Sequence, residues 1–158
     1  MVAPAAAQYR HRQVGWKLLA GTAVGLALAV WLATTLSPAT RAAAPWALAA
    51  LFGVLALAVL MFSTLTVEVD DARIRVKFGI GLIRRTVDLS DVAGCELLRI
   101  RSWWGWGLHW TPGGWLYNIG GREAVRVMIV RERAVIIGTD DADRLKAAID
   151  ARIAARQR

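Results

Sequence analysis

The chain has 158 residues, 56% of them hydrophobic, and a formal net charge of +8. Its mean hydropathy is +0.41, which argues against an ordinary soluble domain. The single cysteine, Cys95, excludes an internal disulfide and any metal site built from several cysteines, and we expect it to be a small core residue. The length leaves room for a membrane anchor and one small domain.

Two uncharged stretches dominate the N-terminal part of the chain. No ionisable residue occurs from Leu18 to Thr40 or from Ala42 to Val67. Each stretch can supply the helix of about 20 residues that crosses a bilayer. We therefore predict a disordered basic tail over 1–15 and a transmembrane helical hairpin over 16–65, with helices at about 16–36 and 46–65. A cleaved signal peptide is the alternative for the first helix, but a second apolar run follows directly.

Basic residues predict the orientation of this hairpin. Arg10, Arg12 and Lys17 precede the first helix, and a further basic cluster follows the second helix from Arg73 to Arg85. The segment between the two helices carries only Arg41. Since lysine and arginine favour the cytoplasmic side, both termini are predicted to be cytoplasmic.

After Leu65 the hydropathy pattern of the sequence changes from long apolar runs to an alternation with a period of two. The segment "TVEVDDARIRVKFG" alternates apolar and polar residues around Asp70-Asp71, which predicts a β-hairpin with one buried face. Further strands, separated by turn signals, are predicted near Leu82–Leu89, Gly94–Arg101, Trp104–Thr111, Trp115–Ile119, Ala124–Arg131 and Ala134–Gly138. A C-terminal helix is predicted over about 140–155, with aspartates in its first turn. The fold class is α+β, with about seven or eight antiparallel strands in a domain over 66–158.

The order of these elements and one block of sequence are similar to those of a known protein family. The block is "WGWGLHWTPGGWLYNIGGREAVRV", followed by "IGTDD" and the terminal helix. The chain resembles the bacterial pleckstrin-homology-like (PH-like) membrane proteins. The resemblance implies a bent antiparallel β-barrel or sandwich capped by one C-terminal helix, attached to the bacterial cytoplasmic (inner) membrane. It implies no particular activity and no catalytic residues.

Basic residues of the first hairpin form one candidate site. Arg73, Arg75 and Lys77 alternate along a strand and therefore share a face. The candidate lipid or membrane surface consists of Arg73, Arg75, Lys77, Arg84 and Arg85. Some PH domains bind phosphoinositide head groups in this region, and a polybasic surface beside an anionic leaflet gains about 1 kcal/mol per residue. The alternative is a solvated strand face.

The tryptophan-rich segment forms the second candidate site. Five of the eight tryptophans lie between Trp103 and Trp115. In a strand the rings at even positions share one face and the glycines occupy the other, which predicts a barrel wall with its large rings inward. The alternative is a partner or membrane surface. The candidate residues are Trp103, Trp104, Gly105, Trp106, Gly107, His109, Trp110 and Trp115.

No residue pattern predicts catalysis. His11 and His109 lie in no nucleophile motif or metal-ligand spacing, so no catalytic residue, metal or cofactor is predicted. Residues 66–158 contain sixteen basic and twelve acidic residues, a net of only +4, which disfavours nucleic acid as a partner.

We predict a non-enzymatic binding or scaffold module that recognises a protein partner, or a second copy of itself in a homo-oligomer, at the cytoplasmic face of the membrane. The alternatives are a sensor of anionic membrane lipids through the arginine-rich hairpin and an accessory subunit of a membrane enzyme or transporter.

Overall fold

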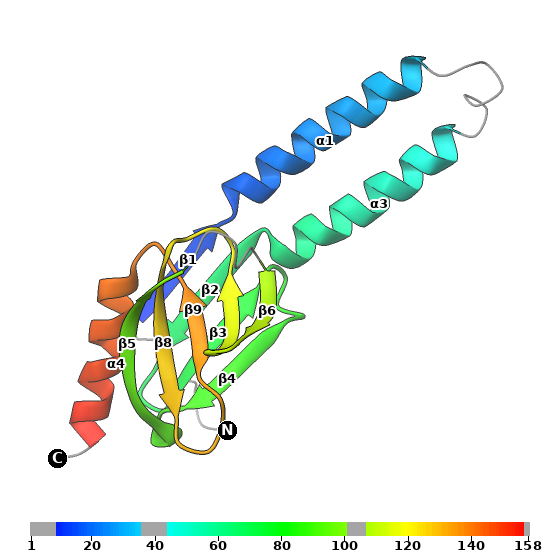
Figure 1. Ribbon diagram of the computed structural model, residues 1–158. Coiled ribbons are helices and arrows are strands. Elements are labelled where there is room, and N and C mark those ends of the chain that lie inside the picture. The colour runs from blue at the N-terminus through cyan, green and yellow to red at the C-terminus, as the bar shows by residue number, and fades with distance from the viewer. Residues whose placement is uncertain (1–8, 36–43, 101–106, 157–158) are drawn as a thin grey trace.

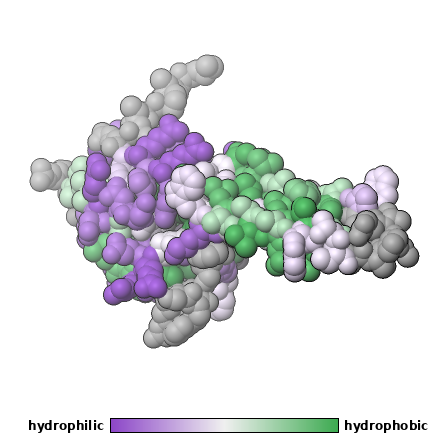
Figure 2. Space-filling model, turned by 90° about the horizontal axis from the view of Figure 1, so that it is seen from above, coloured by the Kyte–Doolittle hydropathy of each residue, from purple (hydrophilic) through white to green (hydrophobic). Residues whose placement is uncertain are grey.

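The computed structural model describes residues 9–35, 44–100 and 107–156. Two long helices project from a domain that consists of two β-sheets and a C-terminal helix (Figure 1). Hydrophobic residues cover the projecting helices, whereas hydrophilic residues cover much of the domain surface seen from above (Figure 2). The apolar and polar parts of the chain are therefore separated in space as they are in sequence.

The projecting helices are α1 (Trp16–Thr35) and α3 (Ala44–Phe62), which run antiparallel (Figure 1). Both are long and apolar enough to cross a membrane, and neither span is buried within the protein. The two predicted helices are thus confirmed as helices. The second ends earlier than predicted, because the chain leaves α3 at Ser63 and enters a strand at Thr64.

The N-terminal segment is a strand rather than a tail. Tyr9–Val14 forms β1, which pairs antiparallel with β2 (Thr64–Val69). The prediction of disorder is therefore wrong for residues 9–14, while residues 1–8 lie outside the described residues. The physical reason is the helical hairpin itself, which returns the chain beside its starting point. Gly15 donates its backbone N–H to Ser63 O at 2.8 Å, so strand pairing continues from the helix ends.

The described strands form two sheets with free edges, not a closed barrel. The first sheet has the order β1-β2-β3-β4 and the second the order β5-β8-β9-β7-β6. The remaining strands are β3 (Arg73–Phe78), β4 (Arg84–Asp88), β5 (Val92–Arg99), β6 (Gly107–Thr111), β7 (Gly114–Asn118), β8 (Glu123–Ile129) and β9 (Val135–Gly138). A short 3-10 turn, Leu89–Asp91, joins the two sheets between β4 and β5.

One pairing contradicts the expected antiparallel arrangement. β9 is antiparallel to β8 but parallel to β7. All four residues of β9 are buried, which is typical of a central strand with both faces covered. The "VIIG" segment is therefore an interior strand between the β5–β8 pair and the β6–β7 hairpin.

The main core lies between the sheets and extends under the C-terminal helix α4 (Ala142–Arg156). It contains Phe78 from the first sheet, Val125 and Ile137 from the second, and Leu145 and Ile149 from α4, each at most 1% exposed. The helix packs against β5 and β8. Tyr9 on β1 donates its hydroxyl to Asp141 just before α4, at 3.3 Å. The β1 side of the sandwich is thus tied to α4.

Candidate functional site

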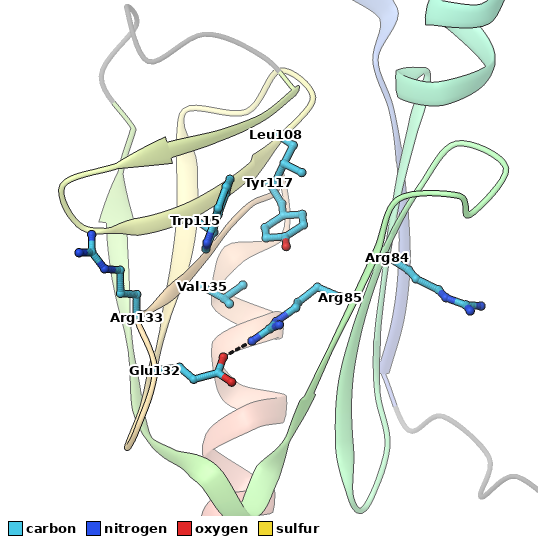
Figure 3. A pocket seen from close by; sticks show the side chains of 8 residues that line it. All are labelled: Arg84, Arg85, Leu108, Trp115, Tyr117, Glu132, Arg133 and Val135. Carbon is cyan, nitrogen blue, oxygen red and sulfur yellow. Dashed lines mark hydrogen bonds and ion pairs between the residues drawn. The ribbon is translucent and has the colours of Figure 1, made fainter.

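A groove lies on the other side of the sandwich, between β4 and the β6-β7-β9 part of the second sheet (Figure 3). It has a volume of about 530 Å³. Its lining combines charged, aromatic and aliphatic side chains from both sheets and from the turn between β8 and β9. The lining residues are Arg84, Arg85, Leu108, Trp115, Tyr117, Glu132, Arg133 and Val135.

Strand pairing places four large side chains on the groove face of the β6–β7 hairpin. Leu108 is opposite Tyr117, and Trp110 is opposite Trp115, and residues two apart along each strand share a face. Tyr117 is 7% exposed and stacks on Phe78, with ring centroids 5.9 Å apart. This face is therefore continuous with the main core at Tyr117.

The two tryptophans at the far end of this face are not core residues. Trp110 is 55% exposed and Trp115 is 45% exposed. The prediction of an inward, core-filling ring is therefore wrong for Trp110, and Trp115, for which no inward ring was predicted, is exposed as well. Both face the side of the other sheet, but the sandwich is open there. Four other candidates, Trp103, Trp104, Gly105 and Trp106, lie outside the described residues.

Charged residues occupy the rim of the groove. Arg85 extends from β4 and forms an ion pair with Glu132 in the β8–β9 turn (Figure 3). The guanidinium carbon of Arg133 lies 5.2 Å from the ring centroid of Trp110, a cation–π contact. Within the described residues Arg133 has no carboxylate partner. The rim therefore carries two guanidinium groups and one carboxylate, which leaves it with a net positive charge.

The pair Arg84 and Arg85, predicted as one basic cluster, is divided by the strand. Successive side chains of a strand point to opposite faces, so Arg85 lies on the inner side with the buried Val87. Figure 3 shows the guanidinium of Arg84 directed away from the other lining residues. Only Arg85 of this pair reaches the centre of the groove.

Tyr117 provides the groove with a neutral hydroxyl. Burial raises the pKa of this phenol, and the nearby charge of Arg85 lowers it in part. The net shift is upward, so the hydroxyl stays protonated and available as a hydrogen-bond donor near neutral pH. It points into the groove in Figure 3.

The basic face of β3 is matched by acidic residues. Arg73 lies 2.8 Å from Asp88, and Lys77 lies 3.3 Å from Glu68. Arg75 contacts Asp70 and lies 3.7 Å from Glu68. Each of the three predicted lipid-binding residues of β3 therefore has a carboxylate partner, although Glu68 is shared by Lys77, Arg75 and Arg10.

Asp70 is the buried member of this network, with 4% of the residue exposed. Burial alone would raise the pKa of its carboxyl group. Hydrogen bonds from the backbone N–H groups of Ala72 and Arg73, and the charges of Arg75 and Arg73, outweigh that effect and lower the pKa. Asp70 is thus held as a carboxylate at the β2–β3 turn.

Two further candidates, His109 and Gly107, and the single cysteine lie close to the core or to the end of α3. His109 lies on the opposite face from Leu108, and its Nε2 atom is buried without a hydrogen-bond partner among the described residues. Gly107 faces Phe62 at the end of α3. Cys95 is half-buried against the core, and burial, with Asp150 beside it, raises the pKa of its thiol to about 12. A thiol this weakly acidic is a poor nucleophile.

A search of the described residues finds no group of three or more histidine, cysteine or carboxylate side chains close enough to hold a metal ion. A comparison of the chain with known protein families, curated proteins and solved structures finds no match. The PH-like resemblance therefore stays a prediction. Sequence reasoning missed Tyr117, Glu132 and Arg133, which carry no motif and meet only through the pairing of β7 with β9 and the β8–β9 turn.

Proposed function

We propose that this chain is a membrane-anchored, non-enzymatic binding protein whose groove holds an extended segment of a protein partner at the cytoplasmic face. The groove between β4 and the β6-β7-β9 surface is the observation that carries the proposal. In this proposal α1 and α3 span a bacterial inner membrane, and the sheet domain is a PH-like module. The basic residues on both sides of the hairpin support cytoplasmic termini.

An extended peptide suits the shape and edges of the groove. Among the described strands, β4 pairs only with β3, so its other edge is available for a further strand. Peptides often bind by adding to such an edge, with alternate side chains entering pockets. Trp115 and Tyr117 supply the aromatic anchor surface that is enriched in protein interfaces.

The charge of the groove selects among peptides. Arg85 and Arg133 outnumber Glu132, so an acidic side chain in the partner would find a positive rim. An apolar side chain beside it would cover Leu108 and Val135. We therefore propose a partner segment in which acidic and apolar residues alternate.

The test uses the full chain in detergent micelles and two panels of synthetic peptides. The first panel alternates Glu with Val, Leu or Phe, and the second replaces every Glu with Lys. We expect saturable binding of the acidic panel, measured by fluorescence anisotropy, and much weaker binding of the basic panel. The binding should weaken with added salt, since surface charges are screened.

The control variant is Arg122→Ala, which removes an exposed arginine outside the groove lining and should bind the acidic peptides like the parent chain. Equal binding of both panels, or no binding of either, would contradict the proposal. A second copy of the chain as the partner would be recognised by concentration-dependent dimerisation that the acidic peptides disrupt.

A further inference from the structure

The turn between β3 and β4, Gly79–Ile83, exposes two large apolar side chains. Ile80 is 62% exposed and Leu82 is 72% exposed. They are among the most exposed aliphatic residues of the described sheet domain. Exposed apolar side chains that lie close together mark contact sites more often than isolated ones do.

The backbone fixes this turn to the base of the helical hairpin. Ile80 donates its N–H to Leu60 O in the last turn of α3 at 3.3 Å, and Gly79 donates to Thr64 O at 2.7 Å. Gly79 has a positive φ of 47°, and a Cβ atom there would lie 1.9 Å from Leu60 O. Only glycine allows this approach. The turn therefore lies beside the point where α3 meets the domain (Figure 1).

Basic residues accompany the turn on the outer face of the first sheet. Strand register aligns Arg12, Thr66, Lys77 and Arg84 in one row across β1, β2, β3 and β4. Lys77 contacts Glu68, but among the described residues neither Arg12 nor Arg84 makes an ion pair. The row lies at the end of the sheet nearest the helices. Glu68 reaches Lys77 within the row, whereas Asp70 and Asp88 pair with arginines farther along the strands.

We infer that the Gly79–Ile83 turn enters the lipid interface beside the helical hairpin and forms a third point of membrane contact. This inference rests on the proposed membrane insertion of α1 and α3. Ile80 and Leu82 meet the boundary between head groups and acyl chains, and Arg12 and Arg84 meet anionic head groups. Trp16, 73% exposed at the start of α1, lies at the same end of the hairpin and suits the same interface.

The contact has a consequence for the groove. With the hairpin alone, the domain tilts together with its helices, since both helices lead directly into strands of the first sheet. A third contact, in the turn that leads into β4 and its Arg85, would limit this tilt. The groove then opens at a defined angle to the membrane surface.

The test places single cysteines in the full chain with Cys95→Ala as background. The substitutions are Leu82→Cys in the turn, Val130→Cys in the β8–β9 turn, and Val24→Cys in α1. All three positions are similarly exposed, at 72%, 66% and 68%. Each variant is labelled with an environment-sensitive fluorophore and reconstituted into vesicles of equal parts phosphatidylcholine and phosphatidylglycerol. Quenching is measured with aqueous iodide and with lipids that carry a doxyl group near the head group or deep in the acyl chain.

We expect the label at position 82 to be quenched several-fold more by the shallow doxyl lipid than the label at position 130, which iodide should quench. The label at position 24 should respond to the deep doxyl lipid. If the label at position 24 is quenched by lipid while that at position 82 is open to iodide, the turn contact is overturned and the anchoring stands. If neither label is quenched by lipid, the membrane anchoring fails, and the turn contact fails with it.

Discussion

The molecule has two basic surfaces that look alike in sequence and differ in structure. On the outer face of β3, each of Arg73, Arg75 and Lys77 has a carboxylate partner. At the groove, Arg85 pairs with Glu132, whereas Arg133 has no carboxylate partner among the described residues and lies over Trp110. The number of arginines along a strand therefore does not determine the local field, because cross-strand register decides which acidic residues lie opposite.

The largest expected effect is on stability, at Asp70. This residue contacts Arg75 on the outer face of β3, where the basic residues are paired with carboxylates, a face that we call the paired surface. An Asp70→Asn substitution keeps the shape but removes the charge that faces Arg75 and accepts two backbone hydrogen bonds. Loss of a buried, hydrogen-bonded charge should lower the free energy of unfolding by about 3 kcal/mol. Urea unfolding of the detergent-solubilised chain, followed by tryptophan fluorescence, measures it. Asp91→Asn, at an exposed residue, is the matched control and should change little.

The same carboxylate predicts a dependence of stability on pH. Because the folded-state pKa of Asp70 is lowered, its contribution is fully present above the unfolded pKa of about 3.9 and is lost as the pH falls through the lower folded value. Urea midpoints of the parent chain should fall in that acid range, and those of Asp70→Asn should fall less. Identical acid profiles for the two chains would contradict the assignment.

A smaller effect is expected at the groove, and on binding rather than stability. Arg85→Ala and Arg133→Ala should each weaken the binding of the acidic peptides about tenfold, since each removes a charge-assisted contact that contributes roughly 1.4 kcal/mol to the binding free energy. Fluorescence anisotropy measures the affinity, and urea unfolding should show little change for Arg133→Ala. Arg73→Ala is the matched substitution on the paired surface. It should leave peptide affinity unchanged, and an equal loss there would abolish the distinction between the two surfaces.

The smallest effect is the stability change on removing Arg73 itself. Its side chain is 55% exposed and its partner Asp88 is 52% exposed. An exposed ion pair of this kind contributes at most about 1 kcal/mol to the free energy of unfolding. Arg73→Ala should therefore unfold at nearly the same urea concentration as the parent chain. A loss as large as that of Asp70→Asn would show that the network acts as one unit.

Elements that are marked by their own sequence, through alternating residues or turn residues, could be predicted. Elements that form only by pairing with a segment far away in the sequence could not. The alternation around Asp70 and the glycine-rich turns located β2 to β9. β1 was missed because "RHRQ" looks like a polar tail, and only its pairing with β2 across the helical hairpin makes it a strand. The groove depends on β4 and the β8–β9 turn, which are distant in sequence. They meet at the Arg85–Glu132 pair, whose members are 47 residues apart along the chain.

The junction between the two helices and the first sheet also determines how the helices and the domain can move together. One residue, Gly15, separates β1 from α1, and one residue, Ser63, separates α3 from β2, with a hydrogen bond between them. Both helices therefore continue into adjacent strands of one sheet without a flexible linker. If α1 and α3 span a bilayer as proposed, a change in helix tilt would be passed directly to the first sheet and, through the core that the two sheets share, to the domain as a whole.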